Sequence, residues 1–320
     1  MASDAEQDPE YLRSRRGGMT AMRRIVAGVD GSEYSLRALR WAVVEAGRHG
    51  ADLLALTTWT ALPPPIASPY VDVNNAVDRQ DGASAAEQAL QTVVANAIAS
   101  NPLIVVEIVA TEGDPAKLLA EQSRHADLVV VGARGRGGIA GWLLGSVSQE
   151  LLRHSFCPVA VVRSPDKDEV AAAEEILRSE WTRVVVGVDG SDYSKSALRW
   201  AAGEATTHNA ELTVASVWTP PPTVDPPYGN IVWGTDLDPQ LQATAILQTT
   251  VEEVLGEDPG LAVRREVRGG NPARVLIDLS EGADALVVGS RGHRGFAGMV
   301  LGSVSQHVAA HAATTVVVVR

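Results

Sequence analysis

A glycine-rich loop between residues 131 and 148 carries the residue types best suited to chemistry. An apolar run over residues 128–131 leads into the spacing G-x2-G-x9-G-S, formed by Gly132, Gly135, Gly145 and Ser146 and followed by Val147 and Ser148. The same spacing recurs later in the chain with Gly289, Gly292, Gly302 and Ser303, followed by Val304 and Ser305. Two copies of such a loop in one chain are not expected by chance.

These residue types predict a cradle for a phosphate group. Glycine lets the backbone take positive φ angles and come close to a ligand. Gly145 and Ser146 lie where a helix is expected to begin, and the N–H groups and dipole of a helix N-terminus attract phosphate oxygens. The hydroxyls of Ser146 and Ser148 would add donors. A single copy fits a flexible turn with a serine N-cap equally well, and the second copy favours the cradle.

The overall charge argues against two classes of partner. The chain has 320 residues, enough for two domains, and carries a net charge of −12 with a pI near 5.1. This balance disfavours nucleic acid and acidic membrane surfaces. Cys157 is the only cysteine, and we expect it to be buried. The acidic start is unlike a signal peptide and no apolar run is long enough to span a membrane, so we expect a cytoplasmic protein.

Short apolar runs alternate with segments of helical periodicity. In the first half we expect strands over 24–30, 52–59, 103–110, 128–131 and 158–163, and helices over 33–48, 85–99, 115–124 and 144–154. Ser32 and Asp114 are expected to cap two helices, and Gly50 to end one. This order predicts an α/β fold with a parallel sheet covered on both faces.

The second half of the chain repeats the first. Asp30 and Trp41 recur 159 positions later as Asp189 and Trp200, and Gly132 recurs 157 positions later as Gly289. The two-residue difference falls in the Pro-rich loops, 60–83 and 219–238, which are long enough to act as lids or binding loops. We therefore expect a flexible tail over 1–22, domains over 23–163 and 182–320, and a linker over 164–181.

With V-D-G-S near the start of each half and the glycine motif complete in both, the sequence resembles a tandem universal stress protein over 23–163 and 182–320. The resemblance implies two tandem doubly wound parallel five-stranded sheets, adenine nucleotide α-hydrolase-like, with strand order 3-2-1-4-5. Family members with this glycine pattern bind ATP. Their phosphate loop matches the motif residues above, and the aspartate that approaches the nucleoside matches Asp30 and Asp189.

The strand order predicts where the two motifs meet. In open parallel sheets, ligands bind beyond the carboxyl ends of the strands, where the winding reverses. That crevice lies between the first and fourth strands, which end near Asp30 and Gly132. Two motifs about 100 residues apart are thus expected to form one site. The alternative for Asp30 is a turn aspartate in an Asp-Gly pair.

Other residue types leave alternatives open. Trp59 and Trp218 are expected in the core, with adenine contact as the alternative. Arginines near the cradles are either solvated or phosphate ligands: Arg134, Arg136, Arg291 and Arg294. The corresponding histidines, His49 with His208 and His154 with His311, form no metal-like cluster in the sequence. We therefore expect surface or capping roles for them and no metal site.

The motifs favour a regulatory function. Neither copy contains the lysine of the G-x4-G-K-S/T loop. We expect an ATP-binding stress-response protein, with Mg²⁺ as an optional companion of ATP, that changes conformation or binds an unidentified regulatory protein. No general base is evident near the cradles, so no catalytic residue is predicted. Slow ATP hydrolysis or adenylate transfer is the alternative, and a scaffold with a structural nucleotide is the third possibility. Residues 159–162 and 315–319 are candidate edge strands where the two repeats, or two chains of a homodimer, would pair.

Overall fold

The structure is a computed structural model that describes residues 22–59, 79–99, 104–135, 144–163, 180–219, 238–257, 259–292 and 301–320. Residues 1–21 of the expected tail, most of the linker and most of both Pro-rich loops lie outside these residues, as do Arg136 and Arg294. Met22, the last residue of the expected tail, is described and buried.

The first repeat alternates strands and helices as expected. Its elements are β1 (Arg24–Gly28), α2 (Glu33–His49), β2 (Asp52–Trp59), α3 (Arg79–Ile98), β3 (Val106–Glu112), α4 (Pro115–Gln122), β4 (Leu128–Gly132), α5 (Ser146–His154) and β5 (Val159–Val162). The second repeat has the same order: β6 (Arg183–Gly187), α7 (Asp192–His208), β7 (Glu211–Trp218), α8 (Pro239–Leu255), β8 (Val263–Gly269), α9 (Pro272–Leu279), β9 (Ala285–Gly289), α10 (Ser303–His311) and β10 (Thr315–Val319).

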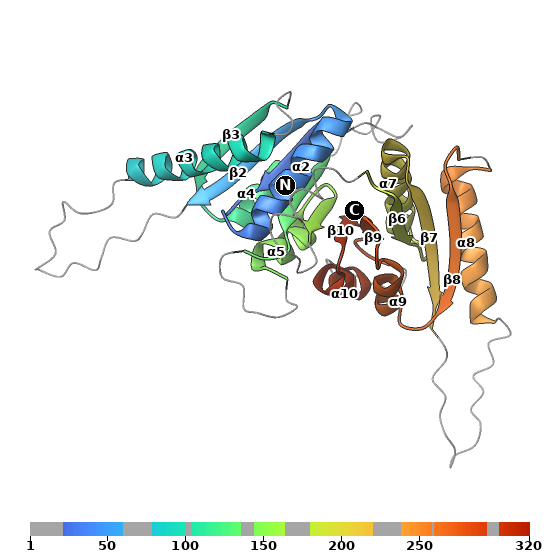
Figure 1. The fold of residues 1–320 in the computed structure, drawn as a ribbon. Coiled ribbons are helices and arrows are strands. Elements are labelled where there is room, and N and C mark those ends of the chain that lie inside the picture. The colour runs from blue at the N-terminus through green and yellow to red at the C-terminus, as the bar shows by residue number, and fades with distance from the viewer. Residues whose placement is uncertain are drawn as a thin grey trace, which may run out of the picture.

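The ten strands form one continuous sheet, whose order is β3-β2-β1-β4-β5-β10-β9-β6-β7-β8 (Figure 1). Each repeat therefore has the expected order 3-2-1-4-5, and its strands are parallel. The repeats join through an antiparallel pair in which Val161 faces Val316 and Val159 faces Val318. The expectation that the two repeats pair through residues 159–162 and 315–319 is therefore confirmed, and this pairing makes the two five-stranded sheets continuous.

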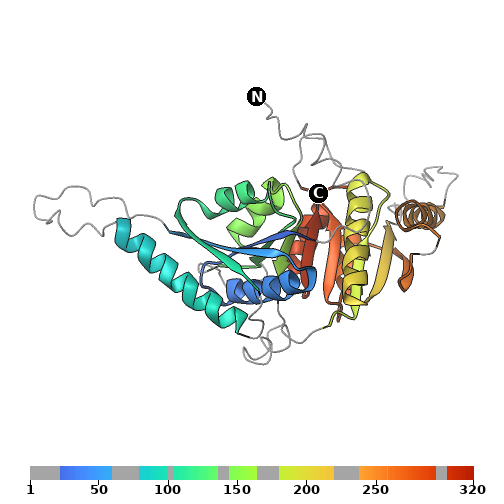
Figure 2. The same ribbon diagram turned by 90° about the horizontal axis from the view of Figure 1, so that it is seen from above.

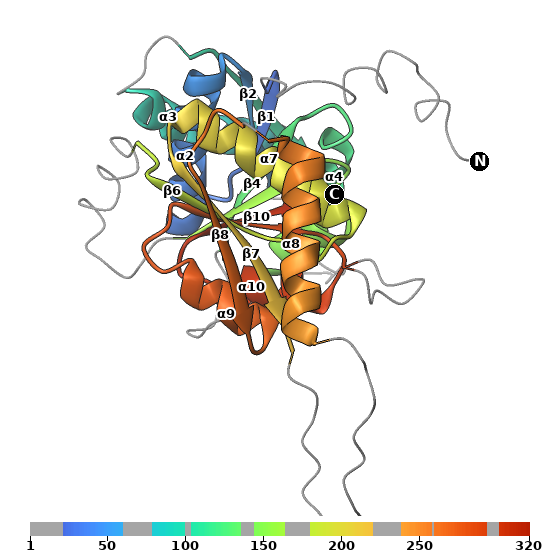
Figure 3. The ribbon, with the colours of Figure 1, turned by 90° about the vertical axis from the view of Figure 1, so that its right-hand side faces the viewer.

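The same pairing removes the expected dimer contact. β5 and β10 are interior strands, so neither offers an open edge to a second chain. The edges of the sheet are β3 and β8, and Figure 3 looks onto the β8 edge with α8 in front of it. A homodimer formed by pairing β5 or β10 between chains is therefore incompatible with this fold.

Two helical layers cover the sheet. α2, α3, α7 and α8 bury apolar side chains against one face, and α4, α5, α9 and α10 against the other. In the first repeat, Figure 2 shows α2 and α3 on one side of the strands and α4 and α5 on the other. Strands such as Leu128–Gly132 are buried along their whole length because both faces are covered.

Local signals set several element ends. The side chain of Ser32 accepts a hydrogen bond from the Ser35 amide and starts α2, and Gly50 ends it in the left-handed conformation at φ 62°. α3 starts before the expected residue 85. A Cβ on Gly82 would stand 3.3 Å from the Trp59 ring, so glycine here allows the helix to pack on that ring rather than breaking it.

The ends of both repeats interlock. The guanidinium of Arg163, after β5, donates hydrogen bonds of 2.7 Å to the carbonyls of Ala309 and Ala310 in the last turn of α10. Arg320, the equivalent residue after β10, donates to the Leu152 carbonyl near the end of α5 at 2.8 Å. Cations are favourable at helix C-termini, where carbonyls lack intrahelical partners. The two arginines thus tie each repeat to a helix of the other.

Candidate functional site

The turn after β1 fixes the first predicted site residue. Oδ1 of Asp30 accepts hydrogen bonds from the amide of Ser32 at 2.9 Å and from its hydroxyl at 2.6 Å. Oδ2 faces the loop after β4, because a Cβ on Gly135 would stand 2.6 Å from it. Asp30 is therefore both a turn aspartate and a carboxylate directed at the glycine motif. Asp189 repeats these contacts with Ser191 and Gly292.

The first glycine of the motif has a packing role. A Cβ on Gly132 would lie 2.7 Å from the backbone carbonyl carbon and oxygen of Tyr34 in α2. Gly289 has the same relation to Tyr193. These glycines let the first turn of α2 approach the end of β4, and the first turn of α7 approach the end of β9. They shape the crevice by bringing its two walls together.

The third glycine differs from the expectation. The Gly145 amide donates to the Ala133 carbonyl at 2.8 Å, and the Gly302 amide donates to the Ser290 carbonyl at 2.8 Å. Neither amide is therefore directed at a ligand. Gly145 is the N-cap of α5, with φ −65° and ψ 154°, and the helix starts at Ser146. The donors left for an anion are the first-turn amides of Ser146, Val147 and Ser148, which have no acceptor within the helix.

The N-termini of α5 and α10 also lack a side-chain cap. The described N-caps of the other helices accept a hydrogen bond through a side chain: Ser32, Asp114, Ser191, Asp238 and Asn271. Gly145 and Gly302 provide none. The two helices that follow the glycine motifs thus have first turns whose amides receive no side-chain acceptor from the N-cap, as in helix N-termini that bind anions.

The second serine of each motif is structural. The buried Ser148 hydroxyl donates to the Gly132 carbonyl at 2.8 Å. In the second repeat the Ser305 hydroxyl lies 3.0 Å from the Ser290 carbonyl and 2.9 Å from that of Gly302. The expectation that Ser148 offers a hydroxyl donor to the ligand is therefore wrong. Ser146 is exposed at the start of α5, where its hydroxyl can reach a ligand.

A cavity of about 490 Å³ lies where these elements meet in the first repeat. All the predicted first-repeat site residues line it: Asp30, Gly132, Gly135, Gly145, Ser146, Val147 and Ser148. Its volume is within the range of ligand pockets, about 300–1,000 Å³. The switch-point crevice predicted from the strand order is therefore present, and it brings the two sequence motifs into one site.

The sequence did not single out the remaining walls of this cavity. Leu56 and Thr58 come from β2, and Pro115 and Leu119 from α4. Thr58 and Pro115 lie close to the carboxyl ends of β2 and β3, so position in a parallel sheet was the available signal for these two residues. Trp59, an open candidate for adenine contact, does not line the cavity among the described residues, and its ring packs near Gly82.

Positive charge lies beside the crevice. Arg134 lines the cavity, and its guanidinium is 5.7 Å from the centre of the Tyr34 ring. Burial, together with the nearby charge of Arg134, lowers the pKa of Arg163 to about 10. Two guanidinium groups thus lie near one another at this end of the sheet, an arrangement that an anion would stabilise. Arg291 and Tyr193 repeat the first contact at 5.5 Å.

The expectation for one histidine pair is wrong. His49 and His208 are neither surface nor capping residues, because their side chains are 6% and 0% exposed and contact Glu204 and Glu45 between the repeats. His154 does lie at the surface, paired with Glu150. The sequence missed the buried cluster because its members come from helices in different repeats.

The fold and site define a tandem doubly wound α/β protein with a crevice at the switch point of its first repeat. The family model described as "Universal stress protein family" matches residues 22–163 and 180–320. The chain belongs to the universal stress protein family.

Known relatives match nearly the whole chain. A universal stress protein of Mycobacterium tuberculosis is 35% identical over 308 residues, and one of Mycolicibacterium smegmatis is 34% identical over 300. Each match covers 92% of this chain and 96% of the relative. A solved universal stress protein from Archaeoglobus fulgidus has a TM-score of 0.61 at 21% identity, with coverage of 94% and 97%, and supports the fold alone. Within the described residues, no helix is both long and apolar enough to cross a bilayer.

Proposed function

We propose that each repeat binds one adenine nucleotide, ATP, and that the bound nucleotide sets the conformation or the partner of a stress-response regulator. Membership of the universal stress protein family indicates the role in stress. The observation that carries the proposal is the pair of helices, α5 and α10, whose N-termini alone among the described N-caps have no side-chain cap and follow the glycine motifs. Such N-termini suit phosphate oxygens.

The remaining walls suit the rest of a nucleotide. Asp30 lies across the first-repeat cavity from α5, where its carboxylate can accept a hydrogen bond from a ribose hydroxyl. Leu56 and Leu119 supply apolar surface of the kind that covers a base. Asp30 is the single carboxylate among the described lining residues, so a Mg²⁺ ion would be held mainly by phosphates and water.

α5 offers a route from the nucleotide to the rest of the molecule. Its first turn faces the cavity, and the Leu152 carbonyl near its other end accepts the hydrogen bond from Arg320 of the second repeat. The helix has nine residues, a rigid element about 13 Å long. A small shift of α5 at its phosphate end would therefore also move the Leu152 carbonyl and alter its hydrogen bond with Arg320 at the junction between the repeats.

Proline substitution tests the amides without removing the helices. Proline suits the first position of a helix because it lacks only an N–H that has no intrahelical partner, and the chain already uses Pro115 and Pro272 in this way. The backbone of Gly145 is compatible with a following proline. Ser146→Pro is expected to weaken ATP binding in the first repeat about tenfold or more, and Ser303→Pro in the second.

Calorimetric titration of the full chain measures the outcome. We expect two tight ATP sites per chain, one in each single variant and none in the double variant, while the Ser146→Ala and Ser303→Ala controls lose only hydroxyl contacts. Two sites of unchanged affinity in the double variant, or no binding by the parent chain, would refute the proposal. Phosphate release measured on the same samples tests the hydrolase alternative, which requires turnover that disappears with binding.

A further inference from the structure

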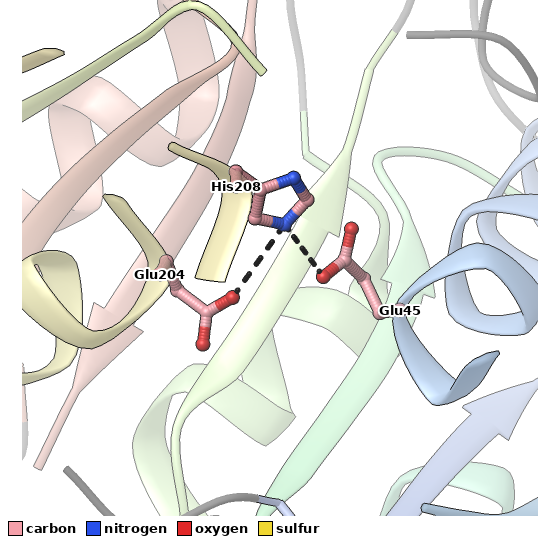
Figure 4. A group of neighbouring side chains, drawn as sticks. All are labelled: Glu45, Glu204 and His208. Carbon is pink, nitrogen blue, oxygen red and sulfur yellow. Dashed lines mark hydrogen bonds and ion pairs between the residues drawn. The ribbon is translucent and has the colours of Figure 1, made fainter. Parts of the chain in front are cut away.

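Four buried ionisable side chains meet between the repeats, where the C-terminal ends of α2 and α7 approach each other. Glu45 and His49 lie one turn apart on α2, and Glu204 and His208 occupy the equivalent positions on α7. We call them the Glu/His cluster. The side chains of Glu45, His49, Glu204 and His208 are 1%, 6%, 4% and 0% exposed. Figure 4 shows the ring nitrogen of His208 directed between the two carboxylates.

The four polar atoms alternate around a closed ring. Nε2 of His49 lies 3.1 Å from Oε2 of Glu204 and 3.9 Å from Oε2 of Glu45. Nε2 of His208 lies 3.1 Å from Oε2 of Glu45 and 3.8 Å from Oε2 of Glu204. Ligand atoms about 2.0–2.1 Å from a tetrahedral Zn²⁺ are about 3.3–3.4 Å apart. The two sides of 3.1 Å are near such an edge, whereas the sides of 3.8 and 3.9 Å are longer than it. The ligand atoms of Glu45, Glu204 and His208 all lie within 4.8 Å of one another, so these three residues are the best-placed ligands.

Two polar atoms of the cluster have no hydrogen-bond partner within the protein. Oε1 of Glu45 and Nδ1 of His208 are both buried without one. Burial raises the pKa of Glu204, against the opposing effect of its hydrogen bond with His49. Burial by itself would lower the pKa of His49, but the hydrogen bond and charge of Glu204 raise it. Buried charges are normally paired or bound to metal, and two carboxylates with one divalent cation are neutral together.

The surroundings hold the ligand atoms in place. Trp181 stacks on the His208 ring at 4.0 Å with an interplanar angle of 12°, which fixes the plane of the imidazole. In a metal site this ring contact would take the orienting role that a hydrogen bond to the second ring nitrogen usually has. Each carboxylate and imidazole is also anchored on a long helix, and such a scaffold positions ligands more accurately than a loop.

We propose that the Glu/His cluster binds one divalent transition-metal ion at the junction between the repeats, and that Zn²⁺ fits best. Two imidazoles and two carboxylates suit Zn²⁺ better than Mg²⁺ or Ca²⁺, which prefer oxygen ligands. Glu45, Glu204 and His208 supply three ligands, and His49, 3.1 Å from Glu204, supplies the fourth. Four protein ligands would leave no position for water, which is the arrangement of a structural site. Bound metal would hold the C-terminal ends of α2 and α7 together and hence fix the relative placement of the two repeats.

Titration of the full chain, freed of any histidine tag and treated with a chelator, tests the site. With ZnCl₂ alone and no nucleotide, we expect one high-affinity Zn²⁺ per chain and a higher midpoint of thermal unfolding. Glu45→Gln with Glu204→Gln keeps the side-chain shapes and is expected to weaken binding about 100-fold or more. The control Glu150→Gln with His154→Gln changes an exposed pair of the same residue types and is expected to leave binding unchanged.

Co²⁺ provides a measurement that does not depend on the variants folding. Tetrahedral Co²⁺ with nitrogen and oxygen ligands absorbs visible light much more strongly than hydrated Co²⁺, and added Zn²⁺ should abolish this absorption. Absence of stoichiometric binding and of the Co²⁺ bands in the parent chain would overturn the proposal, and the cluster would then be a hydrogen-bonded ion-pair network. Equal Zn²⁺ affinity in both double variants would also overturn it.

Discussion

The two repeats have the same backbone contacts around the glycine motif, which we call the anion end of the site. They have different side chains on the wall formed by β2 in the first repeat and by β7 in the second. Asp30 and Asp189 make the same turn contacts, and the N-caps Gly145 and Gly302 bond equivalent carbonyls. At the end of β2, however, the cavity wall consists of Leu56 and Thr58, whereas the matching positions in β7 are Ala215 and Val217.

This difference distinguishes phosphate binding at the anion end from contact with the rest of the ligand at the β2 or β7 wall. The anion end is made of backbone groups, whose positions depend on glycines and helix caps. β2 lies on the side of β1 away from β4, so its wall is remote from α5. Replacing a hydroxyl with a methyl there changes hydrogen bonding and not the fold. We therefore expect the two sites to hold phosphate alike and to differ toward the rest of the ligand.

The largest expected effect tests whether both repeats depend equally on the first glycine of the motif. Gly132→Ala and Gly289→Ala each force a Cβ against the backbone of Tyr34 or Tyr193. We expect each to lower the free energy of unfolding by about 3 kcal/mol, because backbone yields less readily than a side chain. Denaturant unfolding measures it. In the control Gly203→Ala the Cβ meets nothing within 4 Å, and we expect a gain of about 0.5–1 kcal/mol.

The interlocking arginines provide the next comparison. Arg163 donates to two carbonyls of α10 and Arg320 to one of α5. Hydrogen bonds from charged groups contribute about 1.5–3 kcal/mol, less where water competes. We expect Arg163→Met to cost about 2 kcal/mol of stability and Arg320→Met about 1 kcal/mol in thermal unfolding. If Arg320→Met lowers stability more than Arg163→Met, then the number of hydrogen bonds does not determine how much each arginine contributes.

Displacing the aspartates is expected to act on binding rather than on folding. A Cβ on Gly135 crowds Oδ2 of Asp30, and one on Gly292 crowds Asp189. Gly135→Ala should therefore lower ATP affinity in the first repeat about tenfold, or about 1.4 kcal/mol, and Gly292→Ala should do the same in the second. Calorimetry in the Ser303→Pro or Ser146→Pro background isolates one site at a time. Unchanged ATP affinity in both variants would show that Asp30 and Asp189 do not contact the nucleotide.

The smallest effect tests the differing wall directly. In the Ser303→Pro background, Thr58→Val makes the first site resemble the second and should weaken ATP binding a few-fold, about 0.5–1.5 kcal/mol. Val217→Thr in the Ser146→Pro background should strengthen it by a similar factor. If neither exchange changes the affinity, then the hydroxyl of Thr58 does not contact the ligand and the wall difference has another cause.

Local signals predicted the elements whose ends depend on nearby residues. β2 begins and ends as expected, and α2 runs one residue past its expected end, because Ser32, Gly50 and the apolar stripe between them act within a few residues of one another. β3 was expected over residues 103–110 but spans Val106–Glu112. Its polar residues gave a weak signal, and pairing of Glu112 with Trp59 on β2 extends the strand.

By itself the sequence determined the duplicated α/β order, the strand order through the family resemblance, and the meeting of Asp30 with the glycine motif. Each follows from short-range patterns and the rule that parallel strands end at one edge of a sheet. Tertiary structure decided that the Gly145 amide donates to the Ala133 carbonyl, that β5 pairs with β10 of the same chain rather than between two chains, and that Glu45 meets His208. These contacts join groups 12, 155 and 163 residues apart, and the geometry of packed elements, not local propensity, brings them together.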